Sequence, residues 1–530
     1  METEGQLRHR LFGSPIDVTR GQRLLGWLGP LFAMVVGGVL RFWNLGDPHQ
    51  LVFDETYYVK QGWSMILFGV EMRNDPVLNE AKQIDQNFTA GRVLQVYDPT
   101  TGDLVVHPPV GKWLIGWGEQ IFGIDSSFGW RFAICVMGTL SILMIGRAGR
   151  RLFRSSLLGT VAALLLAFEG HHFVHSRTGL LDLILMFWAF AAFCLLLVDR
   201  DASRALLARR LAGLTREEIG RLGRYGPSLG WRPYRLAAGV CLGLACGTKW
   251  SGAYFLIVFG LMTVLWDMGA RRAAGVERWR TAWLVRDTPL ALVWMVVTTV
   301  VVYCLSWWGW FATSIGYNRM WADTHPAEPG FGWVPGAVRS WWNYHAQILE
   351  FHTHLTSDHP YKTNPWSWLV QGRPTSFFYE GPKNGEQGCL VDTCSKAISS
   401  IGTPTVWWAA TLAVFVMLFM WALRRDWRAG AILGGFMGGY VPWFLLGDRT
   451  IYSFYAVAFV PYVVLAVVYV LGLIIGGPSA SALRHKIGLG VTGLFVVSAI
   501  LLFAFFSPIY TAQVVPYSFW SAHMWFPSWI

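Results

Sequence analysis

Long apolar runs alternate with shorter polar segments along this 530-residue chain. Runs such as 288–308 and 485–506 reach about 20 residues, the length at which a helix crosses the hydrocarbon core of a bilayer. Lipid requires every backbone polar group to be paired within a helix or a closed barrel, and the sequence lacks the alternating pattern of barrel strands. The pattern therefore predicts an all-α polytopic membrane protein with about 11 transmembrane helices. We place them at 24–44, 128–147, 156–175, 178–198, 235–250, 251–268, 288–308, 404–423, 429–447, 451–475 and 487–507.

Two segments between spans, 45–127 and 309–403, are too long to be simple connectors. In the first, the stretches 54–69 and 107–123 predict helices that lie on the membrane surface. Between them, 92–107 predicts a β-hairpin around a Pro-Thr-Thr-Gly turn. In the second, 375–403 predicts an irregular loop. The chain then divides into a tail (1–23), a transmembrane module that includes the first loop (24–308), the large loop (309–403), and C-terminal helices with a tail (404–530).

The basic charge of the chain, +11, is unevenly distributed. If the N-terminus is cytoplasmic, six cytoplasmic segments hold 27 of the 43 Lys and Arg: 1–23, 147–154, 199–235, 269–287, 424–428 and 476–486. The positive-inside rule then predicts a cytoplasmic N-terminus, with the two large loops and the C-terminus outside. This bias explains the net charge without nucleic-acid binding. We expect no cleavable signal peptide, because the first span is long, starts past residue 20 and lacks a small-residue cleavage site.

Five of the seven cysteines fall in predicted spans, where a small apolar side chain is sufficient explanation. Cys389 and Cys394 lie instead in the second external loop. An oxidising exterior favours a disulfide between them, and two free thiols are the alternative. A zinc site would need more ligands than this pair offers.

Ionisable residues within or beside predicted spans are costly, so they indicate function. Nearly all of them lie at the outer ends: Arg41, Asp54, Glu55, His107, Lys112, Arg131, Glu169, Arg177, Asp182, Lys249, Asp448 and Arg449. A transporter would carry such charges near the midplane, at broken helices. The distribution therefore favours an enzyme that acts at the external surface.

Asp54 and Glu55 begin the first predicted surface helix. Successive helix positions point about 100° apart, so the two carboxylates predict different roles. One carboxylate is enough to remove the proton from an attacking hydroxyl, and cations would hold a departing phosphate. The cations at suitable depth are Arg131, Arg177, Lys249 and Arg449. The alternative is that Asp54 only caps the helix and Glu55 complements its dipole.

Two pairs of histidines have helical spacing. His171 and His175 are four residues apart, which suits zinc, but no third ligand is placed, and interfacial polar anchoring is the plainer interpretation. His345 and His352 share a helix face, so they line either a substrate groove or a polar helix surface. No phosphate-binding glycine motif or nucleophile elbow occurs, so a nucleotide-sugar donor is not indicated.

Six motifs occur in an order that resembles the dolichyl-phosphate-mannose–protein mannosyltransferases. They are FDETYYV, VHPPVGKWLIGWGEQIFG followed by WRF, HFVHSRTGLLDLILMFW, GLACGTKWSGAYF, YHAQILEFHTHLTSDHPYKTNPWSWLVQGRP and DRTIYSFYAVAFVPYVV. The resemblance covers residues from about 25 to 470. It implies the GT-C glycosyltransferase fold with eleven spans. It also implies an inverting transfer of mannose, from polyprenyl-phosphate mannose to Ser or Thr hydroxyls of exported proteins at the external membrane face.

The resemblance also implies roles for individual residues. Asp54 matches the general base, and Glu55 the partner that helps to hold the acceptor peptide. Arg131 and Lys249 match donor-phosphate ligands, and we add Arg449 for its depth. The expected substrate-binding residues are His107, Arg177, Asp182, His345 and His352.

One departure from the family concerns the large external loop. Eukaryotic members carry a β-trefoil MIR domain there, and 309–403 is too short to hold it. With 35 Arg against 8 Lys, the sequence predicts a bacterial, actinobacterial member of the plasma membrane that uses a carrier other than dolichol. The expected partners are the lipid-linked donor, membrane lipid and secreted Ser/Thr-containing proteins met at the secretion translocon. No cofactor or metal is expected. Alternatives are a related transferase with a lipid or glycan acceptor, and a flippase, which would show midplane charges and repeats.

Overall fold

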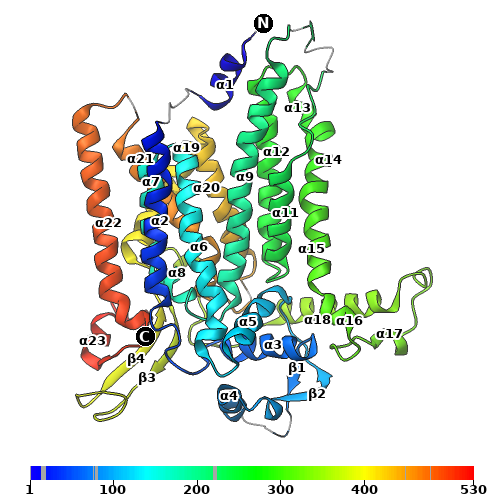
Figure 1. Cartoon of the computed structure of the whole chain (residues 1–530), viewed down its shortest axis with the longest axis vertical. Helices are drawn as coiled ribbons and strands as arrows, with labels where there is room; N and C mark the ends of the chain where they lie inside the picture. Colours follow the sequence, from blue (N-terminus) through cyan, green and yellow to red (C-terminus); the bar gives the residue numbers. More distant parts are fainter. Residues whose placement is uncertain are drawn as a thin grey trace.

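The computed structural model describes residues 2–13, 19–75, 77, 81–215, 217–218, 224–447, 449–477 and 479–530, without the side chains of 81, 82 and 94. Long helices stand side by side in one bundle (Figure 1). The N-terminus lies at one end of the bundle, the N-terminal end. The C-terminus lies at the opposite end, which we call the loop end, because the short helices and strands gather there.

Eight helical stretches of the described chain are long and apolar enough to cross a membrane. They are α2 (Arg20–Phe42), α6 (Ser127–Phe153), α9 (Leu181–Leu211), α12 (Gly252–Ala273), the stretch Trp279–Ser306, α19 (Pro404–Arg424), the stretch Ser453–Ile475 and α22 (Ala482–Tyr510). The first of the two composite stretches joins α13 (Trp279–Ala282), α14 (Thr288–Ala291) and α15 (Thr298–Ser306) through two π-helical turns, and the second joins a 3-10 helix, η6 (Ser453–Phe459), to α21 (Val460–Ile475). The chain is therefore a multi-pass membrane protein, as predicted.

The remaining three predicted spans coincide with shorter helices, α7 (Ser156–Ala167), α11 (Pro233–Cys246) and α20 (Trp427–Gly439), so the count of eleven is not confirmed. Local chemistry ends two of them early. After α7, the Glu169 side chain accepts from the backbone N–H groups of His171 and His172 and starts a new helix, α8 (Gly170–His175). After α20, Pro442 cannot continue an α-helix, and a 3-10 turn (Val441–Leu445) follows.

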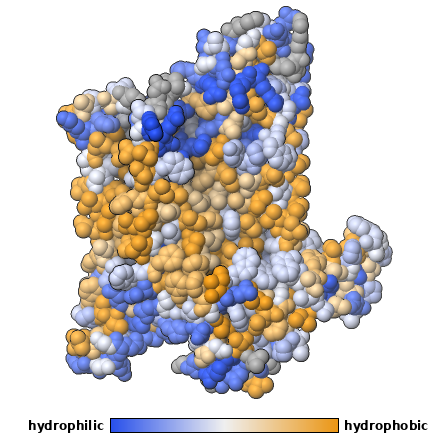
Figure 2. Space-filling model, viewed as in Figure 1, coloured by the Kyte–Doolittle hydropathy of each residue, from blue (hydrophilic) through white to orange (hydrophobic). Residues whose placement is uncertain are grey.

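The surface of the bundle is apolar across its middle and polar at both ends (Figure 2). Large apolar side chains such as Phe32 of α2, Leu412 of α19 and Leu494 of α22 are exposed there, as lipid-facing positions are. Inside, small residues let helices approach closely. A Cβ at Gly29 of α2 would fall 2.0 Å from Oγ1 of Thr160 in α7.

Two helices at the loop end, α3 (Glu55–Phe68) and α5 (Val110–Phe122), confirm that 54–69 and 107–123 are helical, and their position on the membrane surface stays a prediction. The predicted hairpin 92–107 is wrong. Its Pro-Thr-Thr-Gly stretch lies within one strand, β2 (Tyr97–Gly102), which pairs antiparallel with β1 (Met72–Asn74). The pairing register shifts along this stretch, where the Asp98 side chain accepts from the backbone N–H of Thr100. The partner strand nevertheless lies upstream, not across a turn.

The predicted irregular loop 375–403 is also wrong, because it contains a β-hairpin. Strands β3 (Thr375–Glu380) and β4 (Cys394–Ser400) pair antiparallel, and β5 (Val514–Pro516) from the C-terminal tail pairs with β4. Cys389 and Cys394 form a disulfide within the hairpin connection, which confirms that prediction. The other elements are α1 (Glu4–Phe12), α4 (Ala81–Thr89), α16 (Trp308–Ala312), α17 (Trp321–Thr324), α18 (Gly336–His354), α23 (Tyr517–Ala522) and 3-10 turns at Val93–Gln95, Pro365–Ser367 and Pro527–Trp529.

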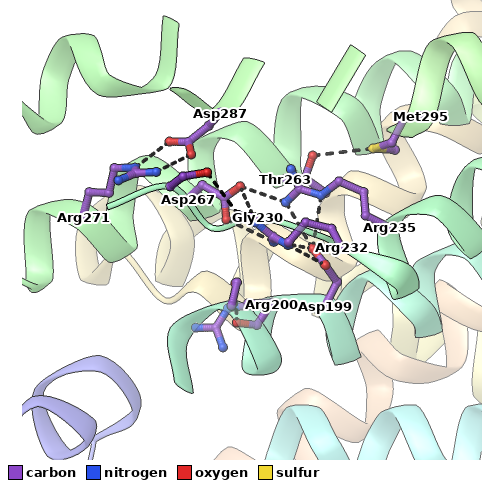
Figure 3. A network of polar contacts seen from close by, with 12 residues as sticks. Asp199, Arg200, Gly230, Arg232, Arg235, Thr263, Asp267, Arg271, Asp287 and Met295 are labelled. Atoms are coloured by element: carbon purple, nitrogen blue, oxygen red, sulfur yellow. Dashed lines mark hydrogen bonds and ion pairs between the residues drawn. The ribbon is translucent and has the colours of Figure 1, made fainter. Parts of the chain in front are cut away.

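Buried ion pairs fasten the helices toward the N-terminal end (Figure 3). Asp199 of α9 and Asp267 of α12 both accept from Arg232 and Arg235, at the start of α11, over distances of 2.5–3.4 Å. Arg271 pairs with Asp287 nearby. Breaking one partner of such a pair leaves an uncompensated buried charge, so these contacts fix the helix positions. The acidic and basic side chains of this cluster pair with one another.

Candidate active site

A cavity of about 780 Å³ lies between α9, α12, α15, α18 and the segment after α20. Much of its wall is apolar, with Leu185, Phe255 and Trp443 among the lining residues. Six predicted site residues line it: His107, Asp182, Lys249, His345, His352 and Arg449. The structure thus brings together residues that are up to 342 positions apart in the chain. Such a wall suits a ligand with a polar end and an apolar body.

Lys249 places a positive charge on the cavity wall. It lies in the turn between α11 and α12, and its Nζ donates to both carboxylate oxygens of Asp182, at 2.9 and 3.0 Å. The same Nζ lies 5.1 Å from the ring centroid of Tyr455. Asp182 sits in the first turn of α9, where a carboxylate complements the helix dipole. The pair holds the ammonium group at one point of the wall.

Arg449 supplies a second positive charge. Nε2 of His352 donates to the carbonyl of Val106 at 2.9 Å, so Nδ1 of the neutral ring accepts from Nη2 of Arg449 at 3.2 Å. Burial, and after it the Arg449 charge, lower the pKa of His352 to about 4, which keeps the ring neutral. Nε of Arg449 is buried and has no hydrogen-bond partner among the described residues. That N–H is therefore an unsatisfied buried donor within the described chain.

His107 and His345 complete the polar part of the wall. His107 is neutral, because burial and Lys249 hold its pKa well below the usual range, and its ring centroid lies 5.4 Å from that of His352. Nδ1 of His345 donates to the carbonyl of Trp341 at 2.8 Å, so its Nε2 accepts from the hydroxyl of Tyr303 at 2.7 Å. Tyr303 could not be singled out from the sequence, because it lies inside an apolar run.

Asp54 occupies the N-cap position of α3, but its side chain caps nothing. The residue is partly exposed, and its side chain makes no hydrogen bond or ion pair within the described chain. Burial raises the pKa of Asp54 to about 6; Lys249 opposes the rise and Asp182 adds to it. Both of these charged residues line the cavity, and Asp54 itself is not among its lining residues. The capping alternative is therefore not what the geometry supports, and the carboxyl has the unengaged oxygens that a base needs.

Phe53 helps to fix the position of the Asp54 carboxyl. Its backbone has φ 50°, a left-handed conformation that a bulky residue rarely adopts, and such strain clusters at functional sites. Its ring stacks on Phe377 of β3 at 4.7 Å and lies edge-on to Phe454 of η6 at 5.1 Å. Packing from two distant segments thus holds the turn that carries Asp54.

Glu55 and Arg131 form a buried pair away from the cavity. Both are at most 1% exposed. Arg131 donates to both carboxylate oxygens of Glu55, at 2.8 and 2.9 Å, and to the carbonyls of Leu45, Pro48 and Gln50. All five of its N–H donors are therefore engaged. Glu55 also accepts from two backbone N–H groups, those of residues 52 and 179. Neither side chain is left free for a substrate in this arrangement.

Other predicted residues also lie outside the cavity. Arg177 donates to the carbonyls of Arg41, Trp43 and Asn44, and so fastens the end of α2. Asp448 falls outside the described residues. His171 and His175 are buried with ring centroids 4.7 Å apart, so they do not anchor the chain at an exposed interface as we predicted.

Comparisons with known proteins show which family the chain resembles. Residues 31–316 match the family model described as dolichyl-phosphate-mannose-protein mannosyltransferase, and 337–529 match the C-terminal four TMM region of protein-O-mannosyltransferase. A polyprenol-phosphate-mannose–protein mannosyltransferase of Mycolicibacterium smegmatis is 37% identical over 97% of this chain and 95% of its own length. One of Corynebacterium glutamicum is 33% identical over 90% and 88%.

Among solved structures, the Saccharomyces cerevisiae Pmt1-Pmt2 complex bound to the sugar donor has a similar fold. The TM-score is 0.69 at 14% identity, over 100% of this chain and 95% of that one. At this level of identity the likeness concerns the fold alone. It confirms the helical membrane fold that the sequence motifs implied.

Proposed function

The chain belongs to the dolichyl-phosphate-mannose–protein mannosyltransferase family, and on that basis we propose how its cavity works. The enzyme transfers mannose from polyprenol-phosphate mannose to proteins. We propose that the cavity holds the donor and that Asp54 accepts the proton of the attacking Ser or Thr hydroxyl. One observation carries the proposal: the carboxyl of Asp54 makes no side-chain hydrogen bond or ion pair within the described chain, and it is influenced by Lys249, which lines the cavity together with a second cation, Arg449.

The reaction needs few groups from the protein. The acceptor oxygen forms a bond with the anomeric carbon of mannose as the bond from that carbon to the phosphate oxygen breaks. The bonding electrons leave with the polyprenyl phosphate, and the hydroxyl proton goes to Asp54. A single displacement of this kind inverts the anomeric configuration. Lys249 and Arg449 stabilise the negative charge that grows on the phosphate.

The remaining predicted residues take supporting roles in this proposal. The apolar wall, with Phe255 and Trp443, accommodates the first units of the polyprenyl chain. His107, His345 and His352 offer neutral polar groups to the sugar and the phosphate. Arg131 and Glu55 position the turn before α3 instead of touching substrate, because their polar groups are occupied. Arg177 holds the end of α2 in the same way.

We place the cavity at the external face of the cell membrane. Two features support this orientation: the excess of Lys and Arg in segments of the N-terminal end, and the Cys389–Cys394 disulfide at the loop end, since disulfides persist in oxidising compartments. Acceptors would then arrive as extended chains from the secretion translocon.

The rate should depend on pH through Asp54. Because the pKa of Asp54 is raised to about 6, the side chain is mostly ionised above that pH and mostly protonated below it. We expect kcat/KM to reach a plateau above about pH 7 and to fall about tenfold per unit well below pH 6. Transfer to a Ser peptide across pH 4.5–8, after a check that the enzyme regains activity at pH 7.5, measures this. A flat profile, or a rate that rises toward low pH, would count against Asp54 as the base.

Arg449→Ala should weaken donor binding. The guanidinium contacts the neutral His352, so its removal leaves no buried charge unpaired. A hydrogen bond to a charged group contributes about 1.5–3 kcal/mol, and we therefore expect donor affinity to fall about 10- to 150-fold. Equilibrium binding of polyprenyl-phosphate mannose to protein in nanodiscs measures it. Lys383→Ala, at an exposed lysine in the β3–β4 connection, is the matched control. Equal affinity for both variants and wild type would reject the phosphate-binding role.

The transfer reaction itself tests the function. Purified protein in nanodiscs is given radiolabelled polyprenyl-phosphate mannose and a Ser/Thr-rich peptide. We expect label on the peptide. A lipid or glycan acceptor in place of the peptide should receive none, and label found only on such an acceptor would overturn the proposed protein acceptor.

A further inference from the structure

The sheet at the loop end has one edge that no other strand occupies. Its strand order is β3-β4-β5, so β3 lies at one side. Within the described residues, β3 has no backbone hydrogen bond to any element except β4. An unpaired edge presents a row of N–H and C=O groups that can template another extended chain. At six residues, β3 is long enough to pair with a peptide.

This strand lies beside the reaction centre. Phe377 of β3 stacks on Phe53, the residue before Asp54, at 4.7 Å and 6°. At the other end of the strand, Nε2 of Gln50 donates to Glu380 at 3.1 Å. Both contacts join β3 to the segment that ends at Asp54. A chain paired with β3 would run about 4.8 Å from it, within reach of the same turn.

A second contact links β3 to a helix that borders the cavity. Thr375, at the start of the strand, lies 3.2 Å from Ser453 through their hydroxyl oxygens. Ser453 begins η6, and Tyr455 two residues later lines the cavity. The strand therefore contacts both the turn that carries the carboxylate and the helix that carries part of the donor wall.

The sheet is cross-linked by a disulfide and an ion pair, and its strand β5 comes from a distant part of the chain. β5 comes from more than a hundred residues downstream and pairs with β4 over three positions, Cys394 to Lys396. The Cys389–Cys394 disulfide and the Lys396–Asp47 ion pair at 3.7 Å hold the hairpin. A short extended segment thus binds to one edge of this sheet, and no strand of the described chain pairs with the opposite edge.

We propose that the acceptor polypeptide binds as an additional strand on the free edge of β3. This inference rests on the proposed function and specifies how its acceptor binds. Backbone pairing holds an extended chain without reading most side chains, so one site serves many sequences that carry Ser or Thr. Alternate side chains of a strand point to opposite faces. One hydroxyl of the bound strand then faces Asp54, while its neighbours face away. The acceptor class is an unfolded, extended polypeptide.

A scan of N-methylated acceptor peptides tests this proposal on the wild-type enzyme. Each peptide carries one Ser and one N-methyl group, placed at successive backbone positions on both sides of the Ser. N-methylation removes one backbone donor. In strand pairing only every second N–H points to the partner, so KM should rise about three- to tenfold at alternating positions and stay near the unmodified value between them.

The outcomes are distinct. A period of two in KM, with donor affinity unchanged across the series, supports the added strand. Equal effects at all positions, or none, would overturn it while transfer to the unmodified peptide still verifies the proposed function. If the unmodified peptide receives no mannose, the proposed function fails, and the strand proposal fails with it.

Discussion

Asp54→Asn should abolish mannose transfer and leave donor binding intact. The amide has the shape of the carboxyl group but cannot accept the hydroxyl proton, and a positioned general base contributes about 10²- to 10⁴-fold to a rate. Because Asp54 caps no helix and pairs with no described residue, its replacement should disturb the fold little. Loss of the carboxylate also leaves the two cations of the donor site in place.

Two measurements on the same preparation separate these effects. Label transfer to a Ser peptide should fall by at least about 100-fold, and donor affinity should stay within about twofold of wild type. Asp392→Asn, at an exposed carboxylate in the disulfide-bonded connection, is the matched control and should transfer normally. Near-normal turnover in Asp54→Asn would remove Asp54 as the base.

Arg131→Ala should destabilise the protein itself. The change leaves the Glu55 carboxylate buried without its cation, and breaking one side of a buried pair costs about 3–5 kcal/mol. Three backbone carbonyls lose their donors as well. We expect a clear drop in the thermal unfolding temperature in detergent and a poor yield of folded protein.

A double variant checks that reason. Arg131→Met with Glu55→Gln removes the uncompensated charge, so its unfolding temperature should lie above that of Arg131→Ala. If Arg131→Ala instead unfolds like wild type and loses only donor affinity, then Arg131 binds the phosphate, as the family resemblance implied, and the positioning role is wrong.

The transmembrane helices could largely be predicted, because the requirement for about 20 apolar residues is local in sequence. The helices that fell short depend on single residues, such as Glu169 and Pro442, whose effect on a helix is local as well but is hidden within an apolar run. The sheet could not be predicted. Its third strand, β5, comes from the C-terminal tail, and no short-range pattern reports a pairing over that distance. The β3–β4 hairpin is local, but a long connection separates its strands and no two-residue turn marks it.

The candidate site shows the same division. His107, Asp182, Lys249 and Arg449 stood out as ionisable groups near the outer ends of spans, and all four line the cavity. The role of Arg131 depended on which partner it meets, and Glu55 lies 76 positions away. Charge type alone could not separate a phosphate ligand from a structural cation. The aromatic support of Asp54 was likewise invisible, since Phe53, Phe377 and Phe454 are ordinary apolar positions until they meet.

The anomeric configuration of the product tests the central claim most directly. Wild-type enzyme is given β-linked polyprenyl-phosphate mannose and a peptide with one Ser, and the one-bond carbon–hydrogen coupling at the anomeric position is measured by NMR. A single displacement with Asp54 as base predicts an α-linked mannosyl serine. A β-linked product would mean two displacements through a covalent intermediate, and it would contradict the assignment of one carboxylate and two cations to this cavity.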